Sequence, residues 1–239
     1  GGAASVENLS VPTGTTLTGA GDLTVGNNLA WSGGTMSGAG QTVIASGSSL
    51  DVTGSVSLQR LITNQSGGVI NLTGTGAVTT SGDVLRLDNQ AGGLVHIQNN
   101  NGFAGTDGNF ETITNAGTFR KTVATGASTI SNITFNNTAG TLDFQGGSTL
   151  AVSGTFNHSG ASSVIAGTVN ASGGGSSSGS LALASGTQVN LTAGTHNLAA
   201  SSSVTGLGRY RVNGGTLSVN GAVSADNLDV LSGTLQGAG

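Results

Sequence analysis

The 239-residue chain contains no cysteine, one proline and eight aromatic residues, and only 7% of its residues are charged. Without cysteine, a disulfide scaffold, a thiolate metal site and a cysteine nucleophile are all excluded. Six lysines and arginines cannot supply the several phosphate contacts that a nucleic-acid interface needs. We therefore expect neither DNA nor RNA as a partner.

Long hydrophobic runs are also missing. No segment approaches the 18 or so apolar residues that would span a bilayer, and no basic and then apolar signal segment opens the chain. We expect no membrane span in this segment and place any export signal outside it. Disorder is disfavoured, because leucine, valine and isoleucine recur regularly and the net charge is only −4.

What the chain has in abundance is glycine, 44 residues, together with a repeated motif. The pattern N-L-x-apolar, then G-T-L or G-T-M, then G-A-G occurs three times, with about 20 residues between the first two copies. Recurrence at this period is typical of solenoids, in which each coil packs on the next. The three copies begin at Asn8, Asn28 and Asn227.

A second repeat lies in the middle of the chain. The segment from Ile62 to Leu72 returns 25 residues later, from Leu87 to Ile97, and weaker copies begin at Ile113 and Phe135. Each copy carries an asparagine two residues after its start. We predict a structural ladder at a corner, in which each amide bonds to the turn or to the asparagine one coil away, and asparagine also tolerates left-handed backbone angles there. Its members are Asn64, Asn89, Asn115 and Asn137.

Short apolar segments separated by glycine or asparagine predict an all-β, single-stranded parallel β-helix, or β-solenoid. We expect one continuous solenoid over residues 1–239, with about 10–12 coils of roughly 20–25 residues. Met36 and Val56 are expected to share a row. Loop insertions are predicted near 99–110 and 172–180, where the rhythm breaks. Since the last repeat ends at the final residue, we expect a fragment or repeat unit of a longer protein.

The segment N-A-G-T-F-R-K, from Asn115 to Lys121, precedes F-N-N-T-A-G-T-L, from Phe135 to Leu142. With this motif the chain resembles segments of large bacterial secreted and surface proteins, the filamentous haemagglutinin-like and autotransporter passenger-like adhesins. The motifs themselves cover about 100 central residues, and the general repeat style is similar over nearly the whole chain. It implies a right-handed β-helix, an extracellular location at the bacterial cell surface, and a stalk or adhesive role.

Catalysis needs a test of its own, because polysaccharide-active enzymes also use β-helices and rely on clustered carboxylates. The densest local set here is Asp83, Arg86 and Asp88, with Glu111 about one coil away. A solvated outer face is the favoured reading of this set. Asp107 with Glu111 is a poor calcium site without help from carbonyl groups. The three histidines lack metal-ligand spacing, so we predict no enzyme, no catalytic residue, no metal site and no cofactor.

Alignment of the central repeats places four polar residues in one outward row on successive coils. A polar row on a flat face is where a glycan could lie, although an ordinary solvated surface is the favoured reading, with an ion pair between the last two members. The members are Asn71, His96, Arg120 and Asp143.

Three functions follow as expectations. The first is a non-enzymatic structural or adhesive rod, whose partner would be a host or cell-surface glycan or protein. The second is a self-assembling extracellular filament subunit that associates end to end through its open strand edges. The third is a glycan-binding module or a polysaccharide-active β-helix enzyme. Threonine does not recur at one phase through consecutive coils, which lowers an ice-binding alternative.

Overall fold

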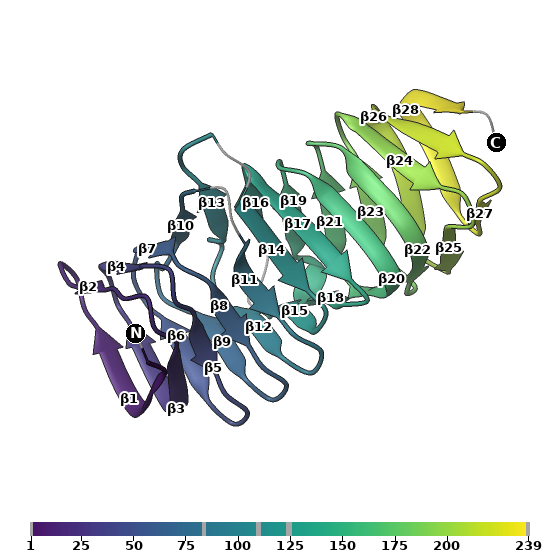
Figure 1. Ribbon diagram of the computed structural model, residues 1–239. Helices are drawn as coiled ribbons and strands as arrows, with labels where there is room; N and C mark the ends of the chain where they lie inside the picture. The colour runs from purple at the N-terminus through teal and green to yellow at the C-terminus, as the bar shows by residue number, and fades with distance from the viewer. Residues whose placement is uncertain (1, 83–84, 109–110, 123–125, 238–239) are drawn as a thin grey trace.

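The computed structural model describes residues 2–82, 85–108, 111–122 and 126–237. All regular structure in these ranges is β-strand except η1 (Gln145–Gly147), a single 3₁₀ turn, and every strand pair is parallel. The strands stack into an elongated solenoid with the two termini at opposite ends (Figure 1). The fold is thus the predicted parallel β-helix of about eleven coils, each contributing one strand to each of three faces.

The first face is a ladder in which each strand pairs with the equivalent strand one coil away. Several of its strands continue around a corner into another face. The strands are β1 (Ala4–Val11), β3 (Leu23–Trp31), β5 (Thr42–Ile44), β8 (Ile62–Asn64), β11 (Leu85–Asn89), β14 (Glu111–Asn115), β17 (Ile133–Thr138), β20 (Phe156–Ala166), β22 (Gly175–Leu183), β24 (Thr195–Ala199), β26 (Arg209–Asn220) and β28 (Leu228–Gly237).

The second face is formed by the C-terminal parts of β1, β3, β20 and β22 together with seven shorter strands. Most of the shorter ones alternate half-buried and buried residues, as strands with one face on a core do. The shorter strands are β6 (Ser49–Val52), β9 (Val69–Leu72), β12 (Leu94–Ile97), β15 (Thr118–Lys121), β18 (Thr141–Phe144), β25 (Ser203–Gly206) and β27 (Ser224–Ala225).

The third face ends with the N-terminal parts of β26 and β28. The sequence-based row of Met36 with Val56 predicts the right pair of strands but the wrong register, because Met36 pairs with Leu58, while Val56 pairs with Val78. The other strands of this face are β2 (Thr16–Leu17), β4 (Thr35–Ser37), β7 (Val56–Gln59), β10 (Val78–Thr80), β13 (Phe103–Gly105), β16 (Ala127–Ser131), β19 (Thr149–Val152), β21 (Thr168–Ala171) and β23 (Gln188–Leu191).

The predicted insertion near 172–180 is wrong. Residues 175–183 form strand β22, which pairs with β20 over nine residues and with β24 and β25 on its other side. The predicted insertion near 99–110 also holds a strand, since β13 within it pairs with β10 and β16. Residues 109–110 lie outside the described residues. Both segments therefore contribute to the regular coils.

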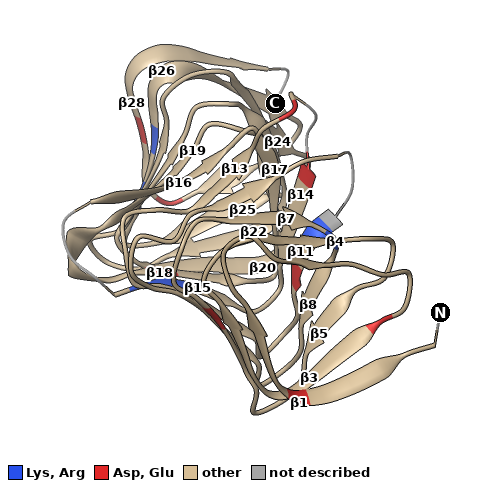
Figure 2. Ribbon diagram, turned by 90° about the vertical axis from the view of Figure 1, so that its left-hand side faces the viewer, with Lys and Arg blue, Asp and Glu red and all other residues tan. Residues whose placement is uncertain are grey.

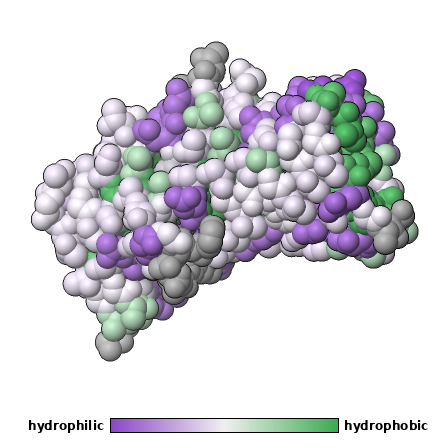
Figure 3. All heavy atoms as spheres, turned by 90° about the horizontal axis from the view of Figure 1, so that it is seen from above, coloured by the Kyte–Doolittle hydropathy of each residue, from purple (hydrophilic) through white to green (hydrophobic). Residues whose placement is uncertain are grey.

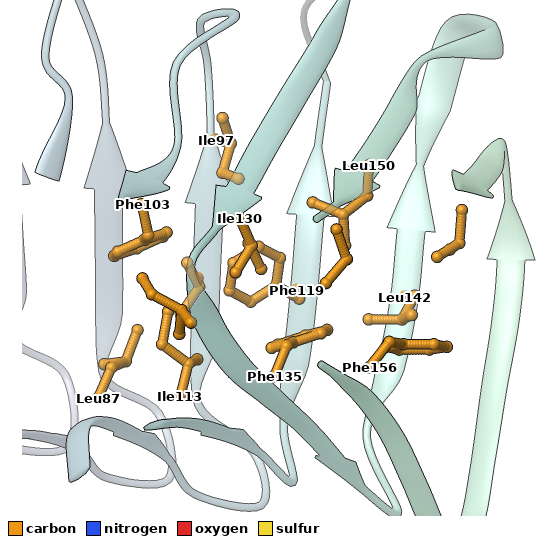
Figure 4. Close-up of a cluster of buried hydrophobic side chains, with 14 of the residues drawn as sticks. Leu87, Ile97, Phe103, Ile113, Phe119, Ile130, Phe135, Leu142, Leu150 and Phe156 are labelled. Carbon is orange, nitrogen blue, oxygen red and sulfur yellow. The ribbon is translucent and has the colours of Figure 1, made fainter. Parts of the chain in front are cut away.

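The core is a narrow column of aliphatic side chains with an aromatic row through its middle (Figure 4). Phe103, Phe119, Phe135 and Phe156 follow one another with ring centroids 5.3–6.1 Å apart. Such spacing suits tilted or offset aromatic contacts, which add to the free energy of burial. In this part of the core each coil adds one aromatic ring, and aliphatic side chains fill the rest.

Candidate functional site

The asparagine ladder lies inside the solenoid, at the end of the first face. Asn64 donates through Nδ2 to Oδ1 of Asn89 at 2.8 Å, Asn89 donates to Asn115 at 2.7 Å, and Asn115 donates to Asn137 at 2.7 Å. All four side chains are fully buried. Since each amide donates in the same axial direction, the chain of dipoles is aligned, and such chains strengthen cooperatively.

The same amides also bond to the turns that follow them. The Nδ2 group of Asn64 reaches the carbonyl of Gly68 at 3.2 Å, and that of Asn137 reaches Gly140 at 3.0 Å. The four asparagines lie in strands β8, β11, β14 and β17, and none has the left-handed backbone angle expected for a corner. Their role in the structure is to satisfy corner carbonyls and one another, which commits their amide groups to the fold.

The outward polar row follows the register of the second face. His96 pairs with Asn71 on one side and with Arg120 on the other, and Arg120 pairs with Asp143. Arg120 Nε lies 2.6 Å from Asp143 Oδ2, and Gln145 Nε2 donates to the same oxygen at 3.0 Å. Asp143 is buried under these two partners, whereas about a third of the Arg120 side chain is exposed.

Neighbouring side chains use most of the row's hydrogen-bonding capacity. Asn71 donates to Asp51 at 2.7 Å, and Nε2 of His96 lies 2.8 Å from Oγ1 of Thr122. Burial lowers the pKa of His96, the nearby Arg120 lowers it further, and Asp143 partly offsets this. The row therefore favours a neutral imidazole and presents a flat, mostly self-bonded polar strip.

Removal of the Asp143 carboxylate is expected to destabilise the central coils. In Asp143→Ala, Arg120 and Gln145 lose their shared acceptor, and hydrogen bonds to charged groups contribute about 1.5–3 kcal/mol when buried. Because Arg120 is partly solvated, we expect a loss of about 1–2 kcal/mol in the free energy of unfolding, measured by urea denaturation.

The matched control is Asp88→Ala, which removes a half-buried carboxylate whose hydrogen bond to Gln90, at 3.4 Å, is long. This variant is expected to change stability by less than about 0.5 kcal/mol. Equal losses in the two variants would contradict a specific role for the ion pair.

The carboxylate candidates do not converge on a catalytic arrangement. Arg86 and Glu111 are both buried, which corrects the expected solvated outer face, while Asp88 is half-buried in β11. Asp83 lies outside the described residues. Burial lowers the pKa of Arg86, and the charges of Glu111 and Asp107 oppose this shift. Arg86 donates to the carbonyl of Ser81, and the two carboxylate oxygens of Glu111 have no hydrogen-bond partner among the described residues.

The calcium-site candidate, Asp107 with Glu111, also gains no support from the structure. Asp107 accepts a hydrogen bond from the backbone N–H of Gly82, an interaction that fixes the turn. Within the described ranges, no group of three or more histidine, aspartate or glutamate side chains is placed to hold a metal ion. In the same ranges, no helix is long and apolar enough to cross a bilayer.

Besides Arg86, the cations of Arg60 and Lys121 are buried at corners, where they bind backbone carbonyls. Arg60 donates to the carbonyls of Gly21 and Gln41, at 3.2 and 2.7 Å. Lys121 Nζ lies 2.6 Å from the carbonyl of Asn99, with Asn100 Oδ1 and Ser128 Oγ within 2.9 Å. Burial lowers the pKa of both groups. Each ammonium or guanidinium group thus donates hydrogen bonds to corner carbonyls.

Sequence reasoning missed a buried polar cluster on the strands from β20 to β26. It consists of His158, Ser177, His196 and Tyr210, all at most 2% exposed. His158 pairs in register with both Asn137 and Ser177, so it continues the asparagine ladder with a different residue type. Because the residue changes from asparagine to histidine to serine, the sequence pattern gives no direct signal of the continuation.

Two hollows among the described residues are a small apolar void in the core and an open hollow at the last coil. An apolar void of about 10 Å³ lies among Trp31, Ile70, Phe103 and their neighbours, which is about the space of one water molecule. A hollow of about 260 Å³ lies at the last coil and is lined by Val219, Leu235, Gln236 and Gly237.

Charged residues are few and lie scattered along the ribbon among the described residues (Figure 2). In comparisons with protein-family models, with curated proteins and with solved structures, no match to this chain is found.

Proposed function

We propose that the chain is a stiff, non-enzymatic rod of a bacterial extracellular or cell-surface protein, with structural and adhesive roles. The observation that carries the proposal is the strand register, which continues through all three faces from β1 to β28. Every coil is hydrogen-bonded to the next along the axis, so bending the rod requires backbone bonds to break. Mechanical stiffness is the property that this architecture provides.

The composition of the interior supports the same proposal. Core side chains, the asparagine ladder and the buried cations all bond or pack between adjacent coils. The described carboxylates lie apart or face a cation, and the outward polar strip bonds mostly to itself. These features stabilise the stacking of coils, which is what a spacer requires.

Negative-stain electron microscopy of the purified chain tests the rod. About eleven coils at roughly 4.8 Å per coil predict straight particles on the order of 50 Å long. A polysaccharide-degrading activity that is lost in Glu111→Gln or Asp88→Asn would overturn the non-enzymatic assignment. The assay should cover acidic and neutral polysaccharides, with Asp226→Asn as a control on the far coils.

The adhesive part of the proposal has its own test. The exposed portion of the polar strip, at His96 and Arg120, is the surface that a glycan would contact. A glycan-array signal that is lost in Arg120→Gln and kept in Asn157→Ala, a half-buried position on another face, would support adhesion through the strip. Signals that are unchanged in Arg120→Gln would place adhesion elsewhere.

A second candidate function is end-to-end assembly, favoured by the apolar surface at the last coil (Figure 3). Val230 and Leu235 are 48% exposed and Leu231 is 61% exposed. Leu235 continues the inward row of Leu217, so it presents core surface to whatever coil stacks next. A further coil, from a second copy of this chain, would cover this surface.

A concentration series in the microscope tests this candidate. Assembly predicts fibres that lengthen with concentration in the natural sequence and stay short in Leu235→Lys. Leu207→Lys is the matched control, because Leu207 is also exposed but lies in the turn after β25, on the side of the rod. Particles of constant length at every concentration would exclude assembly and leave the rod assignment intact.

A further inference from the structure

The buried polar cluster, defined as His158, Ser177, His196 and Tyr210, occupies the inside of four neighbouring strands. His158 lies on β20, Ser177 on β22, His196 on β24 and Tyr210 on β26. The His196 ring lies between Phe156 and Tyr210, with centroids 6.2 and 6.4 Å away, tilted against the first ring and edge-on to the second. His196 is thus a titratable member of the aromatic row in the core.

The cluster's polar atoms are poorly satisfied. Ser177 Oγ lies 2.7 Å from Nε2 of His196, the one hydrogen bond of either ring to a described residue. Both ring nitrogens of His158 and Nδ1 of His196 have no partner among the described residues. Neutral imidazoles are tolerable in such a site, whereas an imidazolium would be an unpaired charge in an apolar core.

The contrast with the other buried cations is direct. Arg60 and Lys121 are also buried, but each is held by several carbonyl or amide oxygens. Among the described residues, no such acceptors bond to the two histidine rings. The described coils of the asparagine ladder, moreover, bury no histidine in their core. Among the described residues, acid therefore places a charge on buried imidazoles in one part of the rod only.

We propose that the buried polar cluster is an acid-release element, in which protonation of His158 and His196 opens the coils from β20 to β26 while the coils of the asparagine ladder stay folded. The rod would then shorten or expose strand edges in an acidic surrounding, beyond its role as a spacer.

The groups that face each ring are few. Strands β17 and β22 flank His158 with Asn137 and Ser177, and β22 and β26 flank His196 with Ser177, Tyr210 and Leu217. Among the described residues, the titratable groups that act on the pair are the two rings themselves and Tyr210. Arg209, Arg211 and Asp229 form ion pairs on the outside of β26 and β28.

The direction of the pH effect follows from burial. Burial lowers the pKa of His158 to about 4 and that of His196 to about 3, with the neighbouring His158 lowering the latter further. In the unfolded chain both groups titrate near a pKa of about 6.5. The contribution of these two histidines to the free energy of unfolding is therefore fully present above about pH 6.5 and is lost as the pH falls toward 4. The reason is that in this range the unfolded state binds protons at both rings, whereas the folded state does not.

Carboxylates contribute in a different window. Hydrogen bonds from Gln41 lower the pKa of Asp22, and those from Arg211 and Arg209 lower the pKa of Asp229. Their contribution is present above about pH 4 and is lost only as the pH falls through their lowered pKa values. An opening between about pH 6 and 4 consequently reports the histidines.

The experiment is hydrogen exchange of the full chain from pH 7.5 to 3, corrected for the intrinsic exchange rate and read by mass spectrometry. Peptides from residues 156–220 are expected to lose protection between about pH 6 and 4, while peptides from residues 42–97 keep theirs. The single Tyr210 provides a fluorescence probe of residues 156–220, and the single Trp31, which pairs with Val52, probes the neighbouring N-terminal coils.

The matched variants are His158→Asn, which repeats the ladder residue, and His196→Phe, which repeats the aromatic row. The double variant is expected to shift the opening of residues 156–220 to lower pH by at least about one unit. His96→Asn, which removes a histidine from the outer strip, is the control and should leave the opening unchanged.

A second measurement stands even if the variants fold poorly. Nuclear magnetic resonance of the imidazoles in the natural sequence should show His158 and His196 neutral at about pH 6, before the coils open, where an ordinary histidine is mostly protonated. Ordinary titration of both rings near pH 6.5 in the folded chain would overturn the proposal. So would loss of protection at one pH along the whole rod, or an unchanged opening in the folded double variant.

Discussion

Replacement of Asn115 by alanine is expected to lower the free energy of unfolding by about 2–5 kcal/mol. The variant removes a link from the middle of the ladder, so that Oδ1 of Asn137 loses its donor and Nδ2 of Asn89 loses its shortest acceptor. Each orphaned buried polar group costs about 1–3 kcal/mol, and the missing amide also leaves a small cavity.

Urea denaturation followed by circular dichroism measures this loss, and hydrogen exchange locates it at β11, β14 and β17. The control is Asn136→Ala on the outer side of β17, where the amide oxygen accepts one partly exposed bond from Asn157. We expect a loss below about 1 kcal/mol there. A ladder variant no less stable than this control would show that the amide chain contributes little.

Replacement of Gly175 by alanine is expected to destabilise the chain by at least about 4 kcal/mol, a very large effect for a single methyl group. A Cβ atom at Gly175 would lie 1.8 Å from the carbonyl oxygen of Phe156 and 2.7 Å from its carbonyl carbon. Both atoms are backbone of the adjacent coil, so no side-chain rotation can relieve the clash. The φ of +145° adds strain for any L-residue.

Gly186→Ala is the matched control, because Gly186 also has a positive φ, +79°, but a Cβ atom added there would meet no other atom within 4 Å. The expected loss there is about 1–2 kcal/mol from the left-handed backbone alone. Thermal and urea denaturation compare the two variants. Similar losses at both positions would mean that the coils around β20 and β22 separate easily.

The two substitutions probe different causes of stability in one solenoid. At Asn115 the side chain bonds along the axis, whereas at Gly175 the absence of a side chain lets two backbones approach. Because each coil contacts mainly its neighbours, local defects in such stacks open local coils. This is also the physical reason why two histidines can act on part of the rod only.

Much of the fold could be predicted from the chain's own periodicity. Apolar residues at every second position, with breaks of glycine or asparagine, indicate short strands, and repetition after 20–25 residues indicates their stacking. The same repeats align Asn64 with Asn89 and His96 with Arg120, as the strand register does. Alignment of repeats works because coils of similar sequence turn at the same points.

Other features were decided by the tertiary structure. Residues 175–183 are rich in glycine and serine and look like a linker, yet they form β22, because the strands on both sides supply backbone hydrogen bonds. Corner geometry pairs Met36 with Leu58, although coil length suggests Val56. The burial of Glu111 and Arg86 is likewise set by their coil's position against its neighbours.

By itself, then, the sequence determined that this protein is a stack of parallel β-coils with an asparagine ladder, since both follow from local repetition. Only the tertiary structure decided that His158, Ser177, His196 and Tyr210 meet in the core. These residues belong to different repeats and different residue types. Their proximity depends on where each corner begins and ends along the chain, and packing between coils decides those positions.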